Sequence, residues 1–241
     1  MRGATLAVLR SRPGWVLPYN PVVQFEFVRG IAWRGNRTGG GSVVPAEILL
    51  GNATADTCMA VDAAGVWRNY PANTLCRSNK GLAPWEARTN LALWCRDLTN
   101  AAWVKVTMTT ALTATGIDGA ANAATTCTAA GASSTILQTV TQASTADTVS
   151  FFIRRRTGTG TIEITPDGVA FTDITTALAT AATATAGGWY RAVVSATLVN
   201  PVFGLRITTS TDAVDVDFAQ LEAGTFVTSP IATTTVSVAR A

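Results

Sequence analysis

Residues 189–218 read WYRAVVSATLVNPVFGLRITTSTDAVDVDF and contain three β-type runs, Trp189–Leu198, Val202–Thr208 and Val214–Phe218. Alternation of apolar and polar residues with a period of two is typical of half-buried strands. In the first run, Trp189 and Tyr190 are expected on opposite faces of the strand. No amphipathic helical pattern separates the three runs. This stretch therefore predicts consecutive strands of an antiparallel sheet.

Similar runs recur upstream, and turn signals such as Pro166-Asp167-Gly168 lie between them. Residues 109–135 are rich in alanine and threonine, and the threonines and glycines there favour short strands and loops over a helix. The upstream runs are Trp103–Met108, Ile136–Thr141, Val149–Arg155 and Thr161–Thr165. The chain is therefore predicted to be all-β, with residues 91–241 forming an antiparallel, jelly-roll-like β-sandwich.

The first 90 residues divide into two further regions. Three prolines among residues 1–21 predict an extended arm, and Val22–Trp33 has a strand pattern. A glycine run at Gly39–Gly41 marks a boundary, so residues 1–40 are predicted to be an N-terminal anchor. Residues 41–90 are predicted to form a small connecting region around a hairpin that turns at 62–65.

Composition excludes several classes of function. The chain has 241 residues, of which 48% are hydrophobic and 14% charged, and this is enough for a sizeable core. It contains no histidine, which removes the commonest general base and metal ligand. No apolar run is long enough to span a membrane, and the apolar stretch near the start is too short for an export signal. We expect no catalytic residues, no metal, no cofactor and no membrane partner.

Positive charge is concentrated in the N-terminal region. Residues 1–40 contain six arginines and one acid, Glu26. Such a segment can be a nucleic-acid arm or a docking segment for an acidic protein surface. Docking is favoured over nucleic acid because the arginines alternate with aromatic residues, a mixture typical of protein interfaces. The predicted anchoring residues are Trp15, Phe25, Phe27 and Trp33.

The four cysteines leave two alternatives open. None forms a C-x-x-C pair, and a zinc site would need all four at wide spacing. Buried free thiols are typical of a protein made in bacterial cytoplasm, whereas a disulfide formed after assembly is the alternative. Cys58 and Cys76 are the pair chosen for a disulfide because they flank the predicted hairpin. Without that bridge, all four cysteines are expected to be small core residues.

Two charged clusters lie in or beside the predicted strands, and each has more than one interpretation. Asp212, Asp215 and Asp217 fit a solvated strand face, a weak Ca²⁺ site or a catalytic carboxylate pair, and the solvated face is favoured. The run Arg154-Arg155-Arg156 is the densest basic cluster of the chain. It suits a solvated strand end or subunit contact better than contact with nucleic acid or an acidic capsule.

Three blocks spread over residues 52–241 carry a resemblance to a known family. The first includes VDAAGV at 61–66 and EARTNL at 86–91, and the second is LWCRDLTNAAWVK at 93–105. The third pairs GWYR at 188–191 with AQLEAGTFVTSPI at 219–231. On these motifs the chain resembles tail and virion proteins of tailed bacteriophages that carry a carbohydrate-binding-module-like β-sandwich. The cysteines at 58, 76 and 95 depart from the pattern of that family.

The resemblance implies a non-enzymatic, structural component of a phage particle, in a tail, collar or head fibre or spike. It implies a virion location after assembly in the host bacterial cytoplasm, other virion proteins as partners, and a homotrimer. The alternative is a receptor-binding module for host-surface glycans. For that role the GWYR motif offers Trp189 and Tyr190, of which one is expected to fill the core and the other to stack on a sugar.

Overall fold

The computed structural model describes residues 58–62, 66–71 and 87–240 with their side chains, except the side chain of residue 186. It describes the backbone alone of 22–26, 31–35, 41–45, 77–78 and 81–82. Strands dominate these residues, and the one α-helix among them is α2 (Thr175–Ala184), which a short 3₁₀ turn, η1 (Ala186–Gly188), follows. The predicted all-β class is confirmed.

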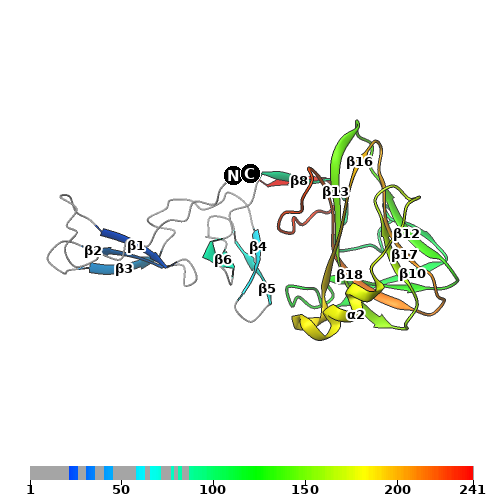
Figure 1. Ribbon diagram of the computed structural model, residues 1–241, viewed down its shortest axis with the longest axis horizontal. Coiled ribbons are helices and arrows are strands. Elements are labelled where there is room, and N and C mark those ends of the chain that lie inside the picture. The colour runs from blue at the N-terminus through cyan, green and yellow to red at the C-terminus, as the bar shows by residue number, and fades with distance from the viewer. Residues whose placement is uncertain are drawn as a thin grey trace.

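Two antiparallel five-stranded sheets form a sandwich (Figure 1). The first, here called the β18 sheet, has the order β10 (Met108–Ala114), β11 (Ala124–Ala129), β18 (Ala213–Ala223), β13 (Thr145–Thr157), β16 (Tyr190–Leu198). The second, the β17 sheet, has the order β15 (Thr172–Asp173), β14 (Ile162–Thr165), β17 (Val202–Ile207), β12 (Ser134–Thr139), β9 (Val104–Val106). The predicted strands match these elements closely. The jelly-roll connectivity stays a prediction.

The main core lies between the two sheets. Alternate residues of β13 turn inward, and Phe151 is fully buried there. The rings of Trp103 and Phe203 meet edge to face with centroids 5.5 Å apart, and Phe151 lies 6.2 Å from Phe203. Such aromatic contacts add to the free energy gained from burial. One face of each sheet is therefore buried in a common core, and the central strands β13 and β18 are buried on their other face as well.

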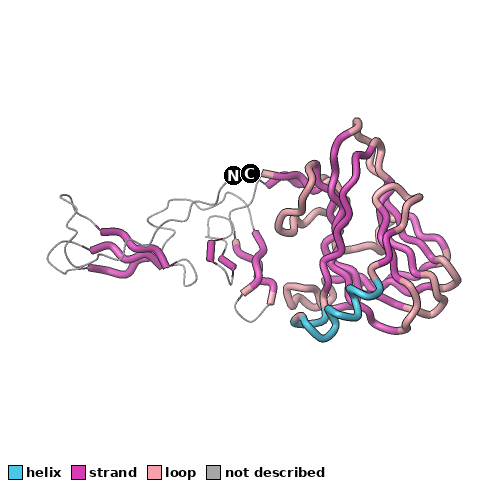
Figure 2. Tube along the Cα trace, in the orientation of Figure 1, coloured by secondary structure: helices cyan, strands magenta, loops and turns pink. Residues whose placement is uncertain are grey.

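Helix α2 is a difference from the sequence prediction, which placed no helix in this stretch. The segment TTALATAATA is rich in alanine, the best helix former. Leu178 and Ala181 are buried, and the carboxylate of Asp173 accepts a hydrogen bond from the backbone N–H of Thr175. The helix lies across one end of the sandwich, beside β13 and β16 (Figure 2). Its small apolar face was too weak a periodic signal to be recognised.

Gly204 marks a close approach between two strands of the β17 sheet. It pairs with Leu137 of β12, and a Cβ atom at Gly204 would lie 2.9 Å from the Cα atom of Leu137. We predict that Gly204→Ala lowers the free energy of unfolding by about 2 kcal/mol, because overpacking of a rigid sheet forces backbone shifts. Urea unfolding measures this. The control is Gly131→Ala, whose Cβ would have Thr107 as its nearest neighbour at 3.5 Å, an ordinary van der Waals distance. Equal effects of the two variants would refute the steric argument.

The sandwich is closed by its first and last segments. Strands β8 (Arg88–Asn90) and β19 (Val238–Arg240) pair with one another, so the chain enters and leaves the sandwich at one place. The side chain of Asn90 is fully buried and donates to the carbonyl oxygens of Ala219 and Ile231. Its Oδ1 atom accepts from the N–H groups of Ala92 and Leu221. The domain boundary predicted between residues 90 and 91 therefore falls within a segment that is bonded to the sandwich.

The second sequence motif forms a loop that is held by Lys105. Its Nζ atom donates to the carbonyl oxygens of Thr99, Asn100 and Trp103 at 2.9–3.0 Å. The indole N–H of Trp103 donates to the carbonyl of Leu93 at 3.1 Å. An ammonium group with three carbonyl acceptors fixes the loop that carries the buried Trp103.

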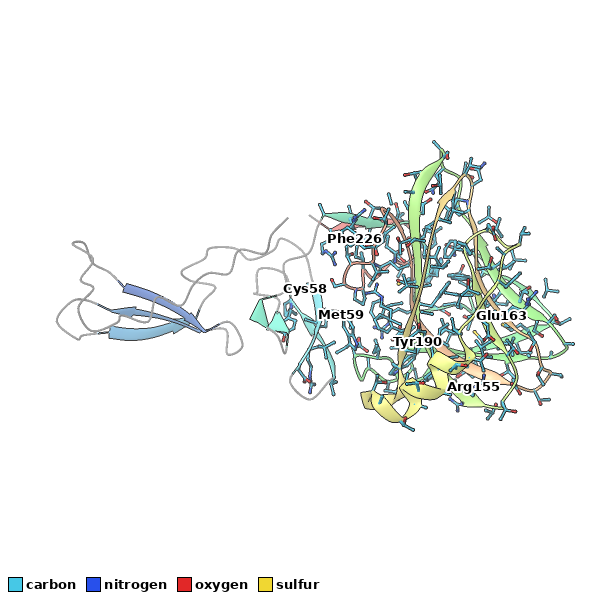
Figure 3. The ribbon with its side chains drawn as sticks, in the orientation of Figure 1. Cys58, Met59, Arg155, Glu163, Tyr190 and Phe226 are labelled. Carbon is cyan, nitrogen blue, oxygen red and sulfur yellow. The ribbon has the colours of Figure 1, made fainter. Side chains whose placement is uncertain are left out.

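A hairpin packs on the outer face of the β18 sheet. It consists of β4 (Cys58–Val61) and β5 (Trp67–Tyr70), with Cys58 opposite Tyr70. Met59 belongs to the main core cluster, and Figure 3 shows it beside Cys58 on the hairpin. The rings of Trp67 and Phe152 meet edge to face at 5.1 Å. The predicted hairpin is present, and it covers part of one sheet. Short strands β6 (Arg77–Ser78) and β7 (Gly81–Leu82) also pair.

The N-terminal region contains a three-stranded sheet of β1 (Val22–Glu26), β2 (Ile31–Gly35) and β3 (Gly41–Pro45). Because β3 pairs with β2, this sheet continues across the boundary expected at residue 40. Of the predicted anchoring residues, Phe25 lies on β1 and Trp33 on β2. Trp15 and Phe27 lie outside the described residues, as does the predicted extended arm.

Candidate functional site

The three aspartates of the β18 region are each held by an arginine. Asp212 pairs with Arg155 at 3.2 Å and accepts from the N–H of Gly160 at 2.7 Å. Asp215 pairs with Arg154 at 2.9 Å, and its side chain is 3% exposed. Both carboxylates are neutralised and nearly closed to solvent. The predicted solvated face is therefore wrong for these acids, because ion pairs bury them, and the ion pairs disfavour the Ca²⁺ and catalytic alternatives.

Asp217 belongs to a second arrangement around Arg96. The guanidinium of Arg96 makes two hydrogen bonds to Asp217 at 2.8 and 2.9 Å and two to Asp118 at 2.9 Å. It also lies over the ring of Phe218, 4.2 Å from the centroid. Burial raises the pKa of Asp217 in spite of these hydrogen bonds. For Asp118, burial opposes ionisation, but the hydrogen bonds and charge of Arg96 together with the backbone N–H of Ala120 outweigh it, and the pKa lies below its usual value.

The run Arg154-Arg155-Arg156 splits into two structural residues and one that is more available. Arg154 binds Asp215 and lies 4.6 Å over the ring of Trp189. Arg155 binds Asp212 and donates to the carbonyl of Gly160 at 2.6 Å. The side chain of Arg156 is 50% exposed, and its contacts with the described residues are long, at 3.3 Å to Asp215 and 3.4 Å to Thr126. Because Arg154 already balances Asp215, Arg156 adds a positive charge to this surface.

Trp189 and Tyr190 lie on opposite faces, as their adjacent positions predict. Trp189 is 7% exposed, and the guanidinium of Arg154 occupies one side of its ring. Tyr190, labelled in Figure 3, begins β16 and packs partly buried against the main core. Neither ring is a fully exposed platform of the kind on which a sugar stacks. The glycan-binding role predicted for this pair stays untested.

A shallow groove of about 180 Å³ lies on the outer face of β10 and β11. Its walls carry threonine hydroxyls, and Arg156 provides the charged group. Thr109 lies opposite Thr128, and Ala111 lies opposite Thr126, so both strands present these residues to the same side. The lining residues are Thr109, Thr110, Ala111, Thr113, Thr126, Thr128 and Arg156.

The threonines of this groove were not predicted as a site. The signal was present, because threonines at alternate positions of one strand share a face. Residues 109, 113, 126 and 128 are all threonines within predicted β-type sequence. What was missing is the pairing of β10 with β11, which brings the two sets together beside Arg156. That pairing depends on the tertiary structure.

The β17 sheet carries a different polar cluster on its outer face. The guanidinium of Arg206 pairs with Glu163 at 2.6 Å and lies over the ring of Phe171, 3.8 Å from the centroid. Arg206, Glu163 and Thr135 are neighbours across three strands. The charges of this pair cancel, so the cluster differs from the groove, where one arginine is in excess.

The three cysteines that the structure describes fit the prediction of one disulfide that includes Cys58. Cys58 is disulfide-bonded, whereas Cys95 and Cys127 are free and buried. The remaining cysteine, Cys76, lies outside the described residues, so the predicted partner stays a prediction. Burial raises the pKa of the Cys127 thiol to about 12. A thiol with so high a pKa is unreactive at neutral pH.

Within the described part of the chain, no group of three or more His, Cys, Asp or Glu residues is arranged to hold a metal ion. Among the same residues, no helix is long and apolar enough to cross a membrane.

Comparison with known proteins gives weak similarities. No protein-family model and no curated protein matches the chain. One similar structure is the CBM22-1–GH10 part of endo-1,4-β-D-xylanase 10B from Clostridium thermocellum complexed with xylohexaose. It is 12% identical over 61% of this chain and 30% of that chain, with a TM-score of 0.37. Another is the CBM22-1 xylan-binding domain of Xyn10C from Paenibacillus barcinonensis, 10% identical over 60% of this chain and 99% of that chain, with a TM-score of 0.37.

This chain thus spans less than one third of the length of the first structure. TM-scores of this size support no argument about function. The assignment of the fold is based on the strands and their pairing in this chain.

Proposed function

We propose that this chain is a non-enzymatic structural subunit of a tailed-bacteriophage particle, a fibre or spike component. It attaches to other virion proteins through residues 1–40, assembles as a homotrimer and carries the β-sandwich as a displayed module. The virion is its place of action. The observation that carries this proposal is the role of the motif residues that resemble phage tail and virion proteins.

Those motif residues build the closure of the sandwich. Asn90 from the first block binds the backbone of Ala219, Leu221 and Ile231 in the third. In the third block, Gln220 accepts from the N–H of Ile231, and Glu222 accepts from the hydroxyl and N–H of Thr228. The first and third blocks therefore meet in one set of buried contacts, which supports a structural role for them. A shared closing device is what a family of displayed modules with varied targets would retain.

The charge arrangement supports a role without catalysis. A hydrolytic carboxylate pair needs one acid that keeps its proton and one that is ionised, both open to substrate. Here Asp212 and Asp215 are nearly closed to solvent and paired with arginines. Asp217 is fully buried against Arg96. These buried ion pairs support a structural role for the three acids.

A truncated chain tests the attachment role. We predict that the sandwich of a variant lacking residues 1–40 still folds, because it closes through β8 and β19 without that segment, although β3 loses its partner β2. The variant should not join particles, since the aromatic and arginine residues of residues 1–40 are suited to an interface. Circular dichroism checks folding, and immunoblotting of purified particles checks incorporation. Normal incorporation of the folded variant would refute the anchor.

The second candidate is a receptor-binding module for host-surface glycans. The observation that favours it is the groove on β10 and β11, where hydroxyl groups and one arginine with an excess charge line an open surface. Hydroxyl and guanidinium groups are suitable partners for the hydroxyls and acidic groups of sugars. The two roles are compatible in one subunit.

A further inference from the structure

The groove on β10 and β11 has a chemistry that selects one class of ligand. We propose that it binds a sugar residue that bears a carboxylate, such as a uronic or nonulosonic acid of a host-surface polysaccharide. Arg156 binds the carboxylate, and the threonine hydroxyls bind the ring hydroxyls. This inference rests on the glycan-binding candidate above and names its substrate class and site.

The first argument is the charge balance around Asp215. Its Oδ2 atom accepts from Nε of Arg154 at 2.9 Å, and its Oδ1 atom accepts from the hydroxyl of Thr126 at 2.7 Å. Arg156 reaches the same Oδ1 atom only at 3.3 Å. One carboxylate thus faces two guanidinium groups, and the second is held weakly. An incoming carboxylate supplies the missing negative charge, and charge-assisted bonds to a guanidinium are strong and bidentate.

The second argument is access. The side chain of Arg156 is 50% exposed, whereas those of Arg154 and Arg155 are 25% and 18% exposed. Thr109, Ala111 and Thr113 are exposed on β10, the edge strand of the same sheet. The guanidinium therefore lies at the side of an open surface, and among the described residues only its Nη1 atom makes hydrogen bonds.

The third argument is the size and lining of the groove. A volume of about 180 Å³ is below that of a typical drug-sized pocket, which is about 300–1,000 Å³. One sugar ring, and not an extended chain, fits such a space. The lining offers hydroxyl groups of threonine, which donate and accept hydrogen bonds, and no aromatic ring. Recognition here therefore depends on polar groups and charge instead of stacking.

The competing surface on the β17 sheet is less suited to an acidic ligand. Glu163 binds Arg206 at 2.6 Å, and Asp173 lies opposite Glu163 in the adjacent strand. An approaching carboxylate would meet two acids beside one arginine. The acidic ligand is therefore assigned to the groove.

The test uses the full-length chain and a panel of acidic bacterial polysaccharides, containing uronic or nonulosonic acids, each beside its carboxyl-reduced form. The reduced form keeps the linkages and ring hydroxyls and loses only the charge. Titration calorimetry or biolayer interferometry measures the affinity. We expect at least one acidic polymer to bind, its reduced form to bind about tenfold more weakly, and the binding to weaken as salt rises.

Two variants and one control locate the site. Arg156→Gln should weaken binding of the acidic polymer about tenfold, the value of one charge-assisted hydrogen bond. Ala111→Phe should abolish binding, because a large ring on exposed β10 fills the groove and leaves Arg156 in place. The control is Arg68→Gln on the hairpin, which removes the same charge from a side chain that is 58% exposed. It should bind as the unaltered chain does, and all three should unfold at the same urea concentration.

The outcomes separate this inference from the function on which it rests. If the unaltered chain binds host cells, but Arg156→Gln and Ala111→Phe bind equally well, the groove assignment is wrong and glycan binding lies elsewhere. Equal affinity for acidic and reduced polymers would overturn the assignment of an acidic sugar. If the chain binds neither cells nor any polymer, this inference and the receptor-binding candidate both fail, and particle incorporation still tests the structural role.

Discussion

Replacing Asn90 with alanine should lower the free energy of unfolding by about 4 kcal/mol, since four buried backbone groups lose their partners at about 1 kcal/mol or more each. The groups are the carbonyls of Ala219 and Ile231 and the N–H groups of Ala92 and Leu221. For a domain of this size such a loss lowers Tm by about 8–16 °C. Urea unfolding and calorimetry measure both quantities.

A second substitution at the same position gives a pH-dependent test. In Asn90→Asp, a carboxyl oxygen replaces the amide group that now faces two carbonyl oxygens. The charged form is disfavoured there, so the pKa of the new carboxyl in the folded state lies above its unfolded value. A raised pKa gives stability at low pH that is lost as pH rises through it. The deficit of Asn90→Asp should therefore be smaller at pH 4 than at pH 7.

The matched control is Asn69→Ala, since Asn69 is exposed on β5. Its free energy of unfolding should stay within about 0.5 kcal/mol of the unaltered chain. An Asn90→Ala variant as stable as this control would show that the hydrogen bonds of Asn90 contribute little to the free energy of unfolding. A pH-independent deficit for Asn90→Asp would contradict the hydrogen-bond arrangement.

Arg96→Met should lower the free energy of unfolding by about 3–5 kcal/mol at pH 7, because removal of one partner leaves buried charges without compensation. Asp217 is fully buried, and the side chain of Asp118 is 13% exposed. The methionine keeps much of the apolar contact of the arginine stem with Phe218. Urea unfolding from pH 7 to pH 4 measures the change.

The pH dependence follows from the two carboxyl groups. The pKa of Asp118 lies below its usual value. Its ionised form therefore stabilises the folded chain at neutral pH, and this stabilisation is lost only when pH falls below that usual value. The pKa of Asp217 is raised, so its ionisation costs stability as pH rises through the raised value. Without Arg96 both pKa values rise, and protonation relieves the unpaired charges. The deficit of Arg96→Met should therefore shrink as pH falls.

The control for Arg96 is Arg68→Met, since the exposed side chain of Arg68 pairs with Asp62 at 2.8 Å. Surface pairs contribute about 0–1 kcal/mol, so this variant should lose little at any pH. If Arg96→Met lowers the free energy of unfolding as little as the control does, then water and not Arg96 stabilises the charge of Asp217. If the loss in free energy of unfolding instead grows as pH falls, the predicted pH dependence is wrong.

The sequence alone determined the local structure of the sandwich. The alternation in Trp189–Leu198 predicts β16 and the opposite faces of Trp189 and Tyr190, because a strand turns successive side chains to opposite sides. The hairpin at Cys58–Val61 followed from a turn sequence between two short apolar runs. Helix α2 was missed, since alanine and threonine give a weak apolar face.

Tertiary structure alone decided the roles of the charged and polar residues. Asp217 and Arg96 are 121 positions apart, and Asn90 and Ile231 are 141 apart. No local pattern encodes such pairs, because strand order brings them together and the sequence period fixes only the face of each residue. The groove has the same origin: alternation places the threonines of β10 and β11 on a surface, but pairing of these strands beside β18 makes that surface one site with Arg156.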